Sequence, residues 1–131
     1  MNTSPVFHNL WPTTIMSVIL PGSEMANQVL SEFINELDDE RSDLTTQYLD
    51  QEFLEIDHPV IKWLSDCFRK ATFDYTKNAG IKYDVDFHIQ AWPNINRFGD
   101  YHNLHNHPHS WLSGTYYVCL LYTSDAADEV Q

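Results

Sequence analysis

Two stretches of the chain repeat apolar residues at the spacing of a helix. The first begins at Ser23, which has the character of a helix N-cap, with Glu24 in the first turn. Its apolar positions are Met25, Val29, Phe33 and Leu37, with Ala26, Leu30 and Ile34 beside them. The second begins at Asp57, has Pro59 near its first turn and ends at Gly80. Its expected buried face consists of Val60, Leu64, Cys67, Phe68 and Ala71. The pattern predicts two amphipathic helices.

Other stretches have the pattern of strands. After Gly80 the apolar residues Tyr83, Val85, Phe87, Ile89 and Ala91 alternate with Asp84, Asp86, His88, Gln90 and Trp92. A period of two predicts a strand with one face on a core. The β-branched content of Thr14–Leu20 and the segment Leu112–Leu121 predict two more strands. Because the helices precede most of the strands, we expect an α+β fold.

Charge and composition argue against some classes of function. A length of 131 residues suits one domain. Seven Lys and Arg against nineteen Asp and Glu give a net charge of −12, which argues against binding of nucleic acid or anionic lipid. No apolar run reaches the roughly 18 residues that span a membrane, and no signal peptide is visible. Two cysteines without a CxxC motif favour a reducing compartment, so we expect a cytoplasmic protein.

Four of the seven histidines lie close together, at His102, His105, His107 and His109. On a strand, the i, i+2 spacing of His105 and His107 puts both imidazoles on one face. Neutral imidazole is a good ligand for Fe, Zn, Cu and Ni, so the spacing predicts a metal site. Solvated side chains in a polar loop are the alternative. His102 is out of phase with the pair, and His109 follows Pro108, which interrupts a strand.

Residues around this cluster are candidates for binding a carboxylate. Asn94 can donate hydrogen bonds and Arg97 can form a bidentate pair, although a turn residue and a surface charge are equally good interpretations. Tyr116 and Tyr117 point to opposite faces of a strand, so at most one of them faces the site. Cys67 lies on an apolar helix face and is expected in the core rather than as a nucleophile.

Four motifs in one stretch carry a family resemblance. They are Trp92-Pro93-Asn94, Gly99-Asp100, His105-Asn106-His107-Pro108 and Ser113-Gly114-Thr115-Tyr116-Tyr117-Val118. The stretch resembles the 2-oxoglutarate/Fe(II)-dependent oxygenases, most of all the subfamily with the signature Trp-x-Asn, Gly-Asp, His-x-His-Pro and Ser-Gly-x-Tyr-Tyr-Val.

The resemblance implies a double-stranded β-helix (a jelly-roll, cupin-like core) with the two helices outside. It implies Fe(II), and 2-oxoglutarate as a co-substrate that is converted to succinate and CO2 while a substrate is hydroxylated. That substrate is not identified; a small molecule and a peptide are both compatible. His105 is carried over as the first iron ligand, and His107 stands where related oxygenases have a carboxylate. Asn94 and Tyr116 are assigned to cofactor binding.

The resemblance also implies an incomplete domain. A jelly-roll needs about eight strands, and the family's distal histidine and basic anchor for 2-oxoglutarate have no counterpart here. Residues 119–131 depart from the family pattern and resemble translated library-adapter sequence. We therefore expect a partial oxygenase domain over residues 1–118, a non-native tail over residues 119–131, and a polypeptide that is itself inactive.

Two other functions remain open. Gly99-x5-His105-x-His107 fits the first half of a cupin motif, although Trp111 and Leu112 stand where a cupin has Glu. In a non-catalytic binding module, the histidines would be surface polar groups.

Overall fold

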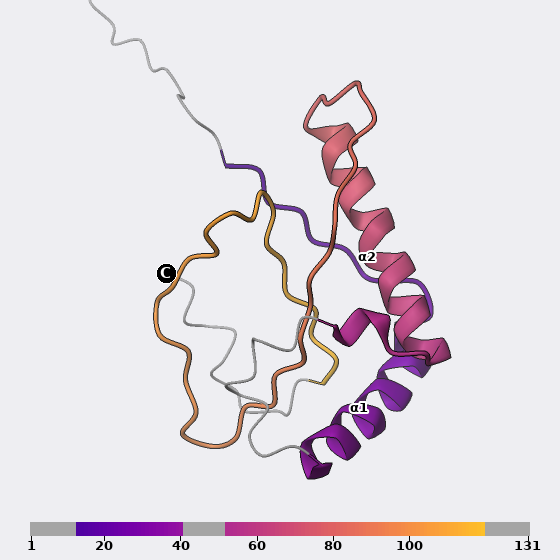
Figure 1. The fold of residues 1–131 in the computed structure, drawn as a ribbon, viewed down its shortest axis with the longest axis vertical. Helices are drawn as coiled ribbons and strands as arrows, with labels where there is room; N and C mark the ends of the chain where they lie inside the picture. Colours follow the sequence, from indigo (N-terminus) through magenta and orange to yellow (C-terminus); the bar gives the residue numbers. More distant parts are fainter. Residues whose placement is uncertain (1–12, 41–51, 120–131) are drawn as a thin grey trace, which may run out of the picture.

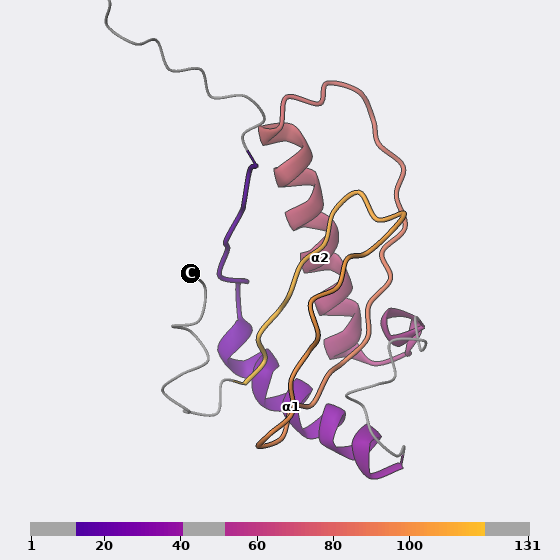
Figure 2. The same cartoon turned by 90° about the vertical axis from the view of Figure 1, so that its left-hand side faces the viewer.

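The computed structural model describes residues 13–40 and 52–119. Within them the chain forms α1 (Ser23–Glu40), the short 3-10 helix η1 (Phe53–Glu55) and α2 (Pro59–Asn78), as Figure 1 shows. Helix α2 packs against both α1 and η1. The chain after α2 forms long irregular segments that run past the helices (Figures 1 and 2). Neither α1 nor α2 is long and apolar enough to cross a membrane.

Helix α1 confirms the first predicted helix, with its cap one residue earlier than expected. The carbonyl of Gly22 accepts the first helical hydrogen bond from the N–H of Ala26 at 3.1 Å, so Ser23 is the first helical residue. Leu30 is the fully buried residue of the inner face, whereas Met25 and Val29 are exposed by 76% and 42%. A row of residues spaced by four drifts around a helix of 3.6 residues per turn, and therefore leaves the buried face.

Helix α2 confirms the second predicted helix. His58, not Asp57, is its N-cap: the Nδ1 atom of His58 accepts a hydrogen bond from the N–H of Val60 at 3.2 Å. The ring of His58 also stacks on Phe33 of α1, with the centroids 4.9 Å apart. The cap therefore joins the start of α2 to the first helix.

Gly80 ends α2 in the way that the sequence predicts. Its φ of 80° lies in the left-handed region, where glycine is favoured. The N–H of Gly80 donates to the carbonyl of Lys77 at 3.1 Å, and that of Ile81 to the carbonyl of Thr76 at 3.1 Å. These two bonds form a Schellman motif, which satisfies carbonyls at the end of the helix.

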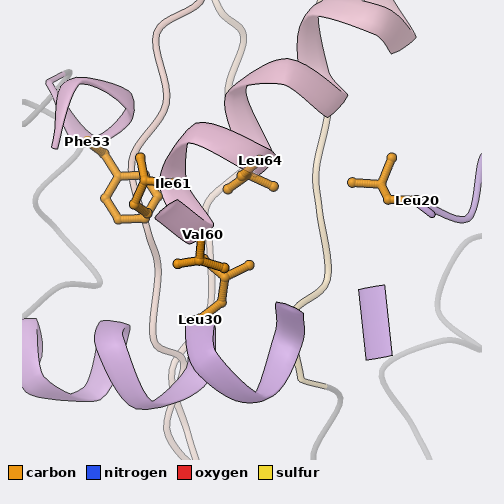
Figure 3. Packing of buried hydrophobic residues seen from close by; sticks show 6 residues of the cluster. All are labelled: Leu20, Leu30, Phe53, Val60, Ile61 and Leu64. Atoms are coloured by element: carbon orange, nitrogen blue, oxygen red, sulfur yellow. The ribbon is translucent and has the colours of Figure 1, made fainter. Parts of the chain in front are cut away.

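The core lies between the helices and is small. Its buried apolar residues are Leu20, Leu30, Phe53, Val60, Ile61 and Leu64. Figure 3 shows Leu30 of α1 against Val60 of α2, and Phe53 of η1 beside Ile61. Three residues of the predicted face of α2, namely Cys67, Phe68 and Ala71, are half-buried. The two helices and η1 thus form the base on which the later segments lie.

Part of the segment after Gly80 shows the expected alternation of burial, without a strand ladder. Val85, Phe87, Ile89 and Ala91 are half-buried, whereas the residues between them are exposed. The prediction is wrong at the two ends of this segment, because Tyr83 is 74% exposed and Trp92 is half-buried. In the part of the chain that the structure describes, the β-pairing consists of an isolated parallel bridge between Glu52 and Ala91. An extended segment shows alternating burial whenever it lies on a surface. A β-ladder also needs a neighbouring strand with free N–H and C=O groups. The α+β jelly-roll stays a prediction.

Residues 13–22 form a strap along α2. The hydroxyl of Tyr75 donates to the carbonyl of Thr14 at 3.1 Å, and the indole Nε1 of Trp63 donates to the carbonyl of Pro21 at 3.3 Å. The strap therefore runs antiparallel to α2. Ile15 and Ile19 remain 85% and 88% exposed, so the predicted strand over Thr14–Leu20 has one residue, Leu20, in the core.

Candidate metal centre

A tight turn precedes the histidine cluster. The N–H of Asp100 donates to the carbonyl of Arg97 at 2.9 Å, and Gly99 at the third position has φ of 92°. A positive φ at this position is typical of a type II turn, and it explains why glycine stands there. The Oδ2 atom of Asp100 also accepts a hydrogen bond from the N–H of Arg97 at 2.7 Å. The Gly99-Asp100 motif thus fixes the point where the chain enters the cluster.

A second turn follows the cluster directly. The N–H of Ser110 donates to the carbonyl of His107 at 3.2 Å, with Pro108 second in the turn and His109 third. His109 has φ of 71°, a left-handed conformation that costs energy for a residue with a side chain. This turn interrupts the extended chain after His107, so His109 does not continue the i, i+2 row.

His105 and His107 lie side by side. Their ring centroids are 5.0 Å apart, and the rings meet edge to face at an interplanar angle of 78°. Two imidazoles on one metal ion, at N–metal–N angles of about 90–109° and metal–nitrogen bonds of about 2.1 Å, have centroids about 4.6–5.3 Å apart. The observed separation therefore fits two ligands of a single ion.

The hydrogen bond of His105 also suits a metal ligand. Its Nδ1 atom lies 2.7 Å from the carbonyl oxygen of Asn103. A carbonyl only accepts, so Nδ1 carries the proton and Nε2 keeps its lone pair. Ligating histidines commonly donate their other ring N–H in this way, which fixes both the tautomer and the direction of the ring. The ring of His107 lies against Trp92, with the centroids 6.0 Å apart.

The remaining histidines are placed differently. The Nε2 atom of His102 is 2.9 Å from Oδ1 of Asn96, so this ring bridges two parts of the segment. His88 and His109 are exposed, and so is Asn94. Among residues 13–40 and 52–119 there is no group of three or more His, Cys, Asp and Glu side chains that could hold a metal ion. The described residues thus offer a pair of imidazoles.

Arg97 contacts a carboxylate within the protein. Its Nη2 atom donates to Oδ2 of Asp38 in the last turn of α1, 59 residues away in the sequence. The side chain of Asp38 is only 12% exposed, although it begins the acidic stretch Asp38-Asp39-Glu40. A carboxylate near the C-terminal end of a helix is repelled by the partial negative charge of the helix dipole there. The place of Asp38 near the end of the predicted helix could therefore have indicated a cationic partner, which the sequence analysis missed.

Tyr116 faces the helices, and Tyr117 is 66% exposed. The hydroxyl of Tyr116 donates to Oδ1 of Asn27 in α1 at 2.6 Å. Its ring makes edge contacts with Trp63 and Phe68 of α2, with centroids 6.4 and 6.1 Å apart. Burial raises the pKa of this hydroxyl. The two tyrosines point to opposite sides, as the period of two predicts, and the structure brings Tyr116 to the helices.

The segment that contains the sequence motifs matches a known protein family. Residues 90–130 match the model of the family described as "Putative 2OG-Fe(II) oxygenase". The matched range contains the paired histidines and the two turns around them, and it also runs through most of the segment after Cys119. No curated protein and no solved structure matches the chain. The predicted tail lies, from residue 120 onward, outside the described residues.

Proposed function

We propose that this chain carries the first two metal ligands of a 2-oxoglutarate/Fe(II)-dependent oxygenase, with Fe(II) bound by His105 and His107. The observation that carries the proposal is the pair of imidazoles, 5.0 Å apart, inside the segment that matches the oxygenase family. The donor set agrees with the metal, because imidazole suits Fe(II) and non-haem iron oxygenases use two histidines and a carboxylate on one face.

Each residue of the site has a defined task in this proposal. His105 presents Nε2 to the metal while Nδ1–H stays on the carbonyl of Asn103. His107 presents the second imidazole, and Trp92 lies against its ring. Fe(II) held by these two imidazoles would supply the activation of O2 by which 2-oxoglutarate is converted to succinate and CO2 and a substrate is hydroxylated. A small molecule and a peptide are both compatible substrates.

Asn94 is the proposed contact of 2-oxoglutarate, because its exposed amide can donate to a carboxylate of the co-substrate. The hydroxyl of Tyr116, also expected there from the family resemblance, donates to Asn27 and is not assigned to 2-oxoglutarate. The guanidinium of Arg97 is held by Asp38, so it is not assigned to 2-oxoglutarate.

Anaerobic isothermal titration of the 131-residue chain with Fe(II) tests the metal assignment. We expect His105→Ala and His107→Ala each to weaken binding by at least about tenfold, since each removes one of two imidazole ligands. His88→Ala is the matched control, because His88 is exposed and lies outside the cluster; its dissociation constant should equal that of the unaltered chain. Equal Fe(II) binding by the chain and by the doubly substituted His105→Ala, His107→Ala variant would refute the assignment and favour a non-catalytic binding module.

Co-substrate binding distinguishes an oxygenase from a cupin-type metalloprotein. We expect 2-oxoglutarate to bind the Fe(II)-loaded chain and not the metal-free chain. Fe(II) binding without any effect of 2-oxoglutarate would favour the cupin. Because the described residues supply two imidazoles, we also propose weak Fe(II) binding and no succinate release by this polypeptide alone. Succinate formation would contradict that last point and support the oxygenase activity.

A further inference from the structure

The histidine segment is joined to α1 at both ends. Arg97 at the start of the segment pairs with Asp38, and Tyr116 at its end donates to Asn27. Asn27 and Asp38 lie about 16 Å apart along the helix, at 1.5 Å per residue. Between these contacts every residue from 101 to 111 is exposed. Other contacts join this segment to neighbouring residues: the ring of His107 lies against Trp92 at a centroid distance of 6.0 Å, and Trp111 lies against Tyr75 of α2 at 6.4 Å. The Nε2 atom of His102 is 2.9 Å from Oδ1 of Asn96.

The contact between Asp38 and Arg97 joins a nearly buried carboxylate to a guanidinium whose side chain is 55% exposed. Asp38 is only 12% exposed, and its Oδ1 atom is buried without a hydrogen-bond partner in the described structure. Arg97 therefore supplies the positive charge for a carboxylate that water hardly reaches. Removing one partner of such a pair leaves a desolvated charge, which is much more costly than losing an exposed pair. Helix α1 and the turn Arg97–Asp100 are thereby held together.

The contact between Tyr116 and Asn27 is partly enclosed. The hydroxyl-to-amide distance is 2.6 Å, and the ring lies against Trp63 and Phe68. Val118, two residues later, also packs against the core. A hydrogen bond in such surroundings is partly shielded from water and fixes the position of Tyr116 along α1.

We propose that Asn27 and Asp38 of α1 are positioning residues for the iron site: through Tyr116 and Arg97 they hold both ends of the segment that carries His105 and His107. The inference rests on the proposed function, since it concerns the same two ligands. Because most residues between the two ends are exposed, the contacts at the ends limit the distance between the two imidazoles before metal binds. Fixing them in advance reduces the conformational entropy lost on binding and so raises affinity.

The test uses isosteric substitutions in the full 131-residue chain. Asp38→Asn removes the charge and keeps the size of the side chain, and Tyr116→Phe removes only the hydroxyl. We expect the double variant to bind Fe(II) about five- to tenfold more weakly under anaerobic titration, with both ligands still present. Asp38→Glu keeps the carboxylate and should restore the affinity of the Asp38→Asn variant to within about twofold of the unaltered chain.

Asp74→Asn is the matched control. Asp74 is also a helical carboxylate paired with a cation, Lys70, but this pair lies within α2 and both side chains are more than half exposed. Its substitution should leave Fe(II) affinity unchanged. Unchanged affinity in the Asp38→Asn, Tyr116→Phe variant, failure of Asp38→Glu to restore it, or an equal loss in Asp74→Asn would each overturn the inference. If His105→Ala, His107→Ala binds Fe(II) as the unaltered chain does, the proposed function fails instead.

Discussion

Ile61 is one of the two fully buried side chains of the small core, the other being Leu30. Ile61 lies in α2, at 0% exposure, beside Phe53. Ile61→Ala removes three carbon atoms, worth about 0.8 kcal/mol each in transfer free energy, or about 2.4 kcal/mol together. The cavity left behind adds to this, so we expect a loss of about 3–4 kcal/mol. That is a large fraction of the 5–15 kcal/mol typical of a folded domain.

Urea unfolding followed by far-ultraviolet circular dichroism measures this loss, because α1 and α2 provide the helical signal. Ile19→Ala is the control: the residue type and the substitution are the same, but Ile19 is 88% exposed in the strap along α2. Its loss should stay below about 0.5 kcal/mol. Equal losses for the two variants, or a loss below about 1 kcal/mol for Ile61→Ala, would refute the core described above.

Three further predictions concern the ends of α2 and its cysteine. Gly80→Ala should lower the free energy of unfolding, measured by thermal unfolding, by about 1 kcal/mol, because Gly80 has φ of 80°, where a side chain is strained even in open space. Gly114→Ala is the control: its methyl group also meets open space, but Gly114 has no positive φ, so its stability should not change. His58→Ala should cost about 1 kcal/mol, since the N–H of Val60 loses its acceptor, and His58→Asn should restore the cap. Burial raises the pKa of the Cys67 thiol, so less thiolate is present near pH 8 and iodoacetamide should alkylate it more slowly than the exposed Cys119.

Each of these has a contrary result. Equal thermal midpoints for Gly80→Ala and Gly114→Ala would contradict the Schellman motif, and an unchanged midpoint for His58→Ala would contradict the cap. Equal alkylation rates at pH 8 would contradict burial of Cys67. The alkylation rate of Cys67 should rise as the pH passes through its raised pKa, because the thiolate form of Cys67 then predominates.

The sequence predicted the helices well because their signals are local. A period of 3.6 over some 18 residues specifies α1 and α2, and Gly80 marks a stop that depends on one backbone angle. The starts of both helices differ slightly from the prediction. Ser23 is the first residue of α1 rather than its N-cap, and α2 begins at Pro59, with His58 as its N-cap, rather than at Asp57. Alternation likewise predicted the burial of Val85, Phe87 and Ile89, while the pairing of strands depends on partners that alternation does not name.

The candidate site was predictable in part for the same reason. Spacing by two places His105 and His107 together because it is a local property of extended chain, and their ring contact agrees with it. The pair of Asp38 and Arg97 joins residues 59 apart, and no local pattern connects them. Spacing also left open which of the two tyrosines faces inward, and packing against α1 and α2 determines that it is Tyr116.

X-ray absorption spectroscopy at the iron edge tests the central claim most directly. The chain is loaded anaerobically with one equivalent of Fe(II), and the imidazole rings around the metal are counted from their scattering. Two rings are expected for the unaltered chain, one for His105→Ala, and two for the control His88→Ala. Iron without imidazole scattering, or an unchanged ring count in His105→Ala, would contradict an iron site at the paired histidines.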